Sequence, residues 1–178
     1  MESAPAAGNS PLEVFARDLA LCLSVNRDRG PALVWPDGVE ALVAESSVAD
    51  LAQAAAETAP GTPPPPSPGL ARATELSEEI GRLLNCEVHS SFILLPAGAE
   101  RTGDRATTDL VLLPVRGGCE CRVHLEPRNP EPTAAEQVLN LRLRAGEALY
   151  VPAGLGYALG GVHAPCVLLV LSLHDSAW

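Results

Sequence analysis

The chain has 178 residues, a net charge of −10 and 47% hydrophobic residues, enough for one domain with a hydrophobic core. Aromatic residues make up only 3% of the chain, so aliphatic side chains must build that core. An acidic chain without a basic run argues against nucleic-acid and anionic-membrane partners. No apolar run approaches the length of a membrane span and no signal-peptide pattern is visible, so we expect a cytoplasmic protein with five free thiols.

The first apolar pattern along the chain is that of an amphipathic helix. Leu12, Phe15 and Leu19 recur at helical spacing, Ser10 can cap the helix, and Pro11 suits its first turn. We expect this helix to cover one face of a sheet.

The composition divides the chain into four parts. Residues 1–10 are small and polar and are expected to be disordered, and residues 11–57 are expected to be helical with one short strand at 31–35. Residues 58–73 are proline-rich and predict a loop or linker, because proline interrupts helices and sheet interiors. A P-x-x-P ligand motif is the alternative there, but no basic residue flanks it closely.

The fourth part, residues 74–178, begins with a helix expected at 77–84 and continues as short apolar runs separated by turns. The expected strands are 88–95, 110–115, 119–125, 139–143, 148–151 and 166–173. Helices followed by strands at this spacing predict an α+β fold, in which a β-sandwich or small barrel has the N-terminal helices packed on one side.

One stretch resembles a known motif. Residues 143–154 read L-x-x-G-E-x-L-Y-V-P-x-G, in which Gly146, Pro152 and Gly154 mark two turns around a short apolar strand. This phrase resembles the JmjC-type oxygenases of the cupin superfamily, especially their bacterial and ribosomal-oxygenase branch. The resemblance covers residues 76–173 and implies a double-stranded β-helix, the cupin or jelly-roll barrel.

The same resemblance implies that the usual chemistry is lost. The H-x-D iron motif of the family falls on Asp104 to Ala106, and its distal histidine falls on Tyr157. Its lysine for 2-oxoglutarate falls on Cys119 and its tryptophan on Cys121. Non-haem Fe(II) of this class needs two imidazoles and one carboxylate on one face. Sliding the register to residues 107–109 supplies no histidine either.

The leading hypothesis is therefore a pseudo-oxygenase without Fe(II) or 2-oxoglutarate, which acts as a binding or partner subunit. We expect a homodimer or a hetero-oligomer, and an interior that binds a small apolar ligand between Cys119, Cys121, Tyr150 and Tyr157. The alternative is an atypical enzyme. It would be either a 2-oxoglutarate-dependent hydroxylase with unorthodox ligands or a metal-free catalyst with Asp104 and Tyr157 as acid and base.

Other ligands and nucleophiles receive less support from the sequence. Cys119 and Cys121 would share one face of a strand and could hold Zn(II) with a nearby histidine, although buried thiols more often pack as small apolar groups. His124 is expected to face the opposite side, and the other three histidines are scattered. No G-x-S-x-G elbow, P-loop or metalloprotease helix motif occurs in the sequence.

Overall fold

A computed structural model describes residues 10–27, 29–39, 42, 68–125 and 137–174. Within these ranges the fold is α+β, with two helices and two antiparallel sheets. The elements are α1 (Pro11–Asn26), β1 (Ala32–Val34), α4 (Pro68–Leu84), β2 (Glu87–Leu95), β3 (Arg101–Arg105), β4 (Asp109–Arg116), β5 (Gly118–Leu125), β6 (Gln137–Arg144), β7 (Ala148–Val151), β8 (Gly156–Gly160) and β9 (Cys166–His174).

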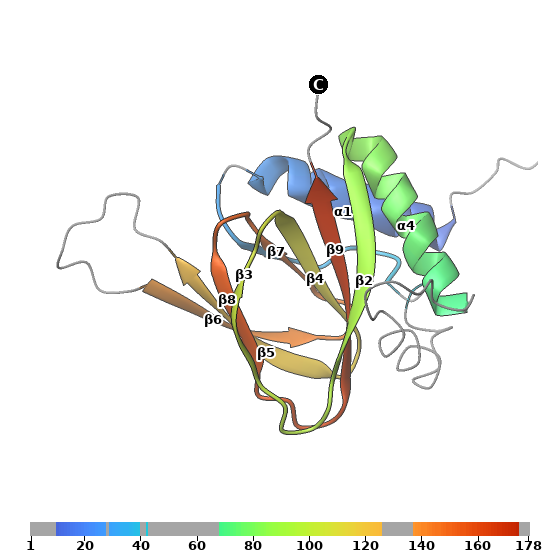
Figure 1. Ribbon diagram of the computed structural model, residues 1–178. Helices are drawn as coiled ribbons and strands as arrows, with labels where there is room; N and C mark the ends of the chain where they lie inside the picture. Colours follow the sequence, from blue (N-terminus) through green and yellow to red (C-terminus); the bar gives the residue numbers. More distant parts are fainter. Residues whose placement is uncertain (1–9, 28, 40–41, 43–67, 126–136, 175–178) are drawn as a thin grey trace, which may run out of the picture.

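The strands form two sheets that face each other. The first has the order β1-β7-β4-β9-β2 and the second has the order β3-β8-β5-β6. Helices α1 and α4 lie together on the outer face of the five-stranded sheet, as Figure 1 shows. This arrangement confirms the predicted class, a jelly-roll barrel with the N-terminal helices on one side.

Alternation along the strands of the first sheet produces two hydrophobic cores. On β4, Val111 and Leu113 face the helices, whereas Leu110 and Leu112 face the second sheet. Strands β7 and β9 follow the same rule, because successive side chains of a strand point to opposite faces. We call these two clusters the helix-side core and the inter-sheet core. Because each face of the first sheet belongs to one of these two cores, its central strands are apolar almost throughout.

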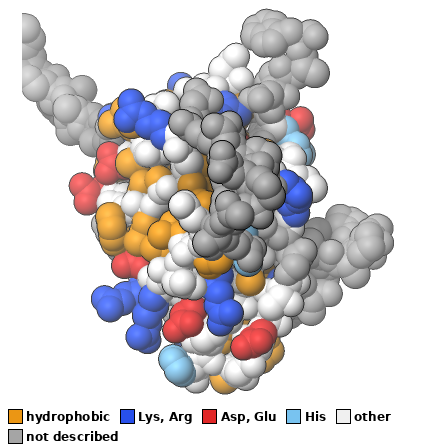
Figure 2. Space-filling view, turned by 90° about the vertical axis from the view of Figure 1, so that its left-hand side faces the viewer, with side chains coloured by type: hydrophobic (Ala, Val, Ile, Leu, Met, Phe, Trp, Pro, Cys, Tyr) orange, Lys and Arg blue, Asp and Glu red, His pale blue; other side chains and the backbone are white. Residues whose placement is uncertain are grey.

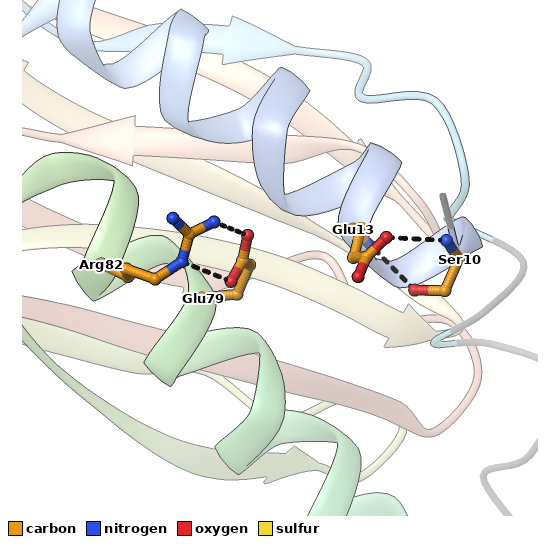
Figure 3. A network of polar contacts seen from close by, with 4 residues as sticks. All are labelled: Ser10, Glu13, Glu79 and Arg82. Carbon is orange, nitrogen blue, oxygen red and sulfur yellow. Dashed lines mark hydrogen bonds and ion pairs between the residues drawn. The ribbon is translucent and has the colours of Figure 1, made fainter. Parts of the chain in front are cut away.

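The start of α1 is formed as predicted. The Ser10 side chain accepts a hydrogen bond from the Glu13 amide at 3.2 Å, and the Glu13 carboxylate accepts one from the Ser10 amide at 2.9 Å, which is a complete capping box. Figure 3 shows this pair beside Glu79 and Arg82 of α4, where the Arg82 Nε donates to Glu79 at 3.0 Å. That hydrogen bond lowers the pKa of the Glu79 carboxyl group.

Several boundaries differ from the sequence-based expectations. Helix α4 begins at Pro68, so the end of the predicted linker at 58–73 is helical, because proline is tolerated in the first turn. The buried stripe Ala73, Leu76 and Ile80 anchors this helix on the helix-side core. Strands β3 and β8 were not predicted, because one is polar and the other begins and ends in glycine.

Three other expectations cannot be compared with the structure. The segment at 1–10, expected to be disordered, lies outside the described residues except for Ser10. The expected helical residues 43–57 and the linker from 58 to 67 also lie outside them. No helix in the described part of the chain is long and apolar enough to cross a membrane.

A polar contact joins the end of α1 to the barrel. The Arg27 Nε lies 3.0 Å from Asp109 Oδ2, and Asp109 Oδ1 accepts a hydrogen bond from the Ala153 amide at 2.9 Å. The Tyr150 hydroxyl donates to the Arg27 carbonyl oxygen at 3.0 Å. Asp109 therefore holds both the helix end and the turn between β7 and β8.

This contact predicts a stability effect. Asp109→Ala removes a half-buried ion pair and leaves the Ala153 amide without its acceptor, so it should lower the free energy of unfolding by about 1–3 kcal/mol. Urea unfolding of Asp109→Ala, Arg27→Ala and the double variant measures the coupling. Strictly additive effects of the two single substitutions would contradict the contact.

Candidate functional site

The register of the second sheet places the implied iron positions beside each other. Asp104 on β3 is the Cα partner of Tyr157 on β8, and Tyr157 in turn is the partner of Val123 on β5. Ala106 follows β3 and binds the turn between β7 and β8. Its amide donates to the Leu155 carbonyl oxygen at 2.9 Å, and its carbonyl oxygen accepts a hydrogen bond from the Gly154 amide at 2.7 Å. Tyr157, which lies some fifty residues further along the chain, is therefore brought next to Asp104 and close to Ala106.

The inner face at this place is apolar and closely packed. Ala106, Cys119, Cys121 and Tyr157 all belong to the inter-sheet core, with exposed fractions of 1, 2, 0 and 7%. Cys119 and Cys121 point to the same side of β5, as the alternation predicted. The structure thus brings three of the four residues of the predicted ligand pocket into one cluster.

Tyr150 does not join this cluster, which corrects the expected pocket wall. It lies in the helix-side core, because it follows Leu149 by one residue and β7 alternates between the two faces. Its ring is 1% exposed, and its hydroxyl is bound to the Arg27 carbonyl. The tyrosine of the recognised motif is therefore a structural residue that ties α1 to the first sheet.

Two buried thiols of the inter-sheet core, Cys119 and Cys121, are held in the neutral form. Burial raises the pKa of Cys121 to about 12. The thiols of Cys119 and Cys166 are hydrogen-bonded, and this contact together with burial raises the pKa of Cys119 well above its usual range. The same hydrogen bond lowers the pKa of Cys166. A thiol is a nucleophile and a metal ligand only as the thiolate, so the neutral side chains of Cys119 and Cys121 pack as apolar groups.

The donor set does not fit the Fe(II) that the resemblance implies. Ala106 has no donor atom, and Tyr157 offers a phenol where the iron site needs an imidazole. Cys119 provides a neutral thiol where a cation would pair with 2-oxoglutarate. The described residues contain no group of three histidine, cysteine or acidic side chains placed to hold a metal ion.

Two sites were not found from the sequence. One is Asp109, whose role depends on the distant Arg27 and Ala153. The other is a hollow of about 400 Å³ on the outside of the second sheet, lined by Glu120, Cys121, Arg122, Asn140, Leu141 and Arg142. Alternating charged residues on a strand could have suggested it, but the pairing of β5 with β6 was not predicted.

Comparison with known proteins supports the fold and no closer relationship. No protein-family model matches the chain, and no curated protein matches it. A prolyl-4-hydroxylase from Pseudomonas putida aligns with a TM-score of 0.56 at 16% identity, over 98% of this chain and 100% of that chain.

Two further solved structures match more weakly. The DMSP lyase DddQ from Ruegeria pomeroyi aligns with a TM-score of 0.40 at 19% identity, over 51% of this chain and 40% of that chain. The CENP-C cupin domain of Drosophila melanogaster aligns with a TM-score of 0.39 at 16% identity, over 47% and 59%. The chain has a cupin-type fold, and at these identities the likeness concerns the fold alone.

The buried thiols lead to a prediction about alkaline stability. Between the ordinary thiol pKa of 9.0 and about 12, Cys121 ionises in the unfolded chain but stays protonated in the fold. The unfolded state then binds fewer protons, so stability should fall as pH rises, by up to about 1.4 kcal/mol per pH unit for each such thiol.

Urea unfolding between pH 7 and pH 10.5 measures this loss. Cys121→Ala should flatten the alkaline slope, and Cys86→Ala, the same substitution at a half-buried position, serves as the control. An unchanged slope in Cys121→Ala would show that this thiol is not the group responsible.

Proposed function

We propose that this chain is a cupin-fold pseudo-oxygenase, which binds neither Fe(II) nor 2-oxoglutarate and acts as a binding or partner subunit. The observation that carries the proposal is the packing of Ala106, Cys119 and Tyr157 within the inter-sheet core. These are positions that the JmjC resemblance assigns to iron and to the cosubstrate. Their side chains contribute apolar contacts and neutral thiols there, and a cation would meet no suitable set of ligands.

The surface provides apolar groups for contact with a partner. Leu21 and Val25 lie one turn apart on α1 and are 63% and 49% exposed, and Trp35 is 66% exposed. Large side chains of this kind are enriched at protein interfaces when they lie close together. A homodimer or a complex with another protein is the quaternary state that we propose.

The alternative function is a metal-free enzyme. The one observation in its favour is that Asp104 and Tyr157 are partners across the β3–β8 ladder, so a carboxyl group and a phenol come from adjacent strands. Such a pair could act as acid and base on a small molecule that enters the barrel. Activity that survives a chelator and is lost in Tyr157→Phe would favour this enzyme over a binding subunit.

Metal analysis tests the leading proposal. Protein purified with added Fe(II) should contain far less than one iron per chain, and added Fe(II) should not change the binding heat of 2-oxoglutarate, because the ligand set that would join the two is absent. One iron per chain in the unmodified protein would refute the proposal and would favour a hydroxylase with unorthodox ligands.

A variant that rebuilds the ligand set of the family is the matched control. Asp104→His, Ala106→Asp and Tyr157→His combined should raise the iron content toward one per chain, provided that the three positions converge as the register indicates. Circular dichroism and the urea midpoint show whether this variant is folded, and light scattering of the unmodified chain gives the number of subunits.

A further inference from the structure

The hollow on the outside of the second sheet has a defined arrangement of side chains. Glu120 and Arg122 project outward from β5, and their Cα partners on β6 are Arg142 and Asn140. Cys121 and Leu141 form the rung between them. The two arginines are therefore diagonal neighbours, with Cα atoms about 7–8 Å apart, a separation that two long guanidinium side chains can bridge to reach one ligand.

Both arginines are available to a ligand. Among the residues that the structure describes, neither the Arg122 nor the Arg142 side chain makes a hydrogen bond or an ion pair. Glu120 lies opposite Arg142 in the ladder but leans toward the β8–β9 turn. Its Cδ and Oε2 stand 2.6 and 2.9 Å from the place where a Cβ on Gly161 would be. Gly161 has φ +59°, so a glycine both allows this turn and leaves room for the carboxylate.

The charge of this sheet is opposite to that of the whole chain. Strands β3, β8, β5 and β6 carry five arginines and two acidic residues, although the chain as a whole has a net charge of −10. Figure 2 looks from the side on which β6 and β8 lie in Figure 1, and in the lower part of that face arginine side chains lie among acidic ones. The lining of the hollow carries two arginines and one carboxylate, Glu120, so its charge is positive and attracts small anions.

We propose that this hollow binds a small organic anion, whose carboxylate or phosphate oxygens accept hydrogen bonds from Arg122 and Arg142. Guanidinium groups match these oxyanions in geometry and charge, and the Asn140 amide adds one more donor. The volume of about 400 Å³ lies within the range of small-molecule sites. Glu120 on the rim favours an anion that also carries a hydroxyl or amino group. The site lies outside the barrel, so it goes beyond the pseudo-oxygenase proposal and is independent of iron binding.

An NMR titration of the full chain tests the site, with inorganic phosphate and succinate as separate probes in low-salt buffer. At least one probe should give saturable shifts that are centred on the amides of residues 120–122 and 140–142. Stronger binding of phosphate would assign a phosphate ester as the natural ligand, and stronger binding of succinate would assign a carboxylate. Absence of saturable shifts with both probes would overturn the proposal.

Matched variants separate a specific site from general charge attraction. Arg122→Gln and Arg142→Gln should each raise Kd about tenfold or more, because each removes a charge-assisted hydrogen bond. Arg116→Gln removes the same charge from an exposed position at the end of β4 on the other sheet and should leave Kd unchanged. Equal weakening by all three substitutions would overturn the proposal.

Asn140→Asp provides a second test that does not depend on removing an arginine. This nearly isosteric change places a carboxylate opposite Arg122 and two residues from Arg142 on β6, so it should abolish binding, whereas Glu120→Gln should lower Kd. All of these side chains lie on the outside of the sheet, so none of the substitutions should lower the unfolding temperature by much. Thermal unfolding of each variant is therefore the folding control. Full binding by a folded Asn140→Asp variant would overturn the proposal.

Discussion

The structure depends on one sheet that serves two hydrophobic cores. Strand β9 pairs with both β4 and β2, and it buries Leu169 and Leu171 against the helices and Leu168 and Val170 against the second sheet. Neither face of this strand can be polar, because each is removed from water by a different layer. The helices are therefore integral to the fold, since without them the outer face of the first sheet would be an exposed apolar surface.

This constraint decides what each residue of the recognised motif does. On β7, Leu149 and Val151 belong to the barrel interior, whereas Tyr150 belongs to the helix side. The Tyr150 hydroxyl and the Asp109 carboxylate both bind Arg27, one at its carbonyl and the other at its guanidinium group. The motif thus supports the docking of α1 as well as the turn that leads to Tyr157. Packing alone therefore explains which residues stand at positions 149–151 of this motif, although the motif resembles part of an active site.

The sequence predicts the apolar strands and the first helix well, because the apolar residues of each recur at regular spacing and each is buried on at least one face. The placement of Cys119 and Cys121 on one face follows from the two-residue alternation of side chains along a strand. Tyr150 was wrongly expected in the barrel interior, because the family resemblance was applied there without this alternation. Strands β3 and β8 were missed, because pairing rather than composition makes them strands. The pocket of Arg122 and Arg142 depends on the β5–β6 register, which sequence patterns do not specify.

The two sides of the second sheet have opposite chemistry, and this bears on where function can reside. Its inner side carries Cys119, Cys121 and Tyr157, whose burial in the inter-sheet core stabilises the barrel. Placing ionised ligands in that closed core would incur a desolvation cost that only a bound cation could offset. The outer side carries arginines that remain in water, and they can bind an anion without such a cost. The interior of this barrel is a hydrophobic core, and the anion site that we propose therefore lies on the outer face of the second sheet.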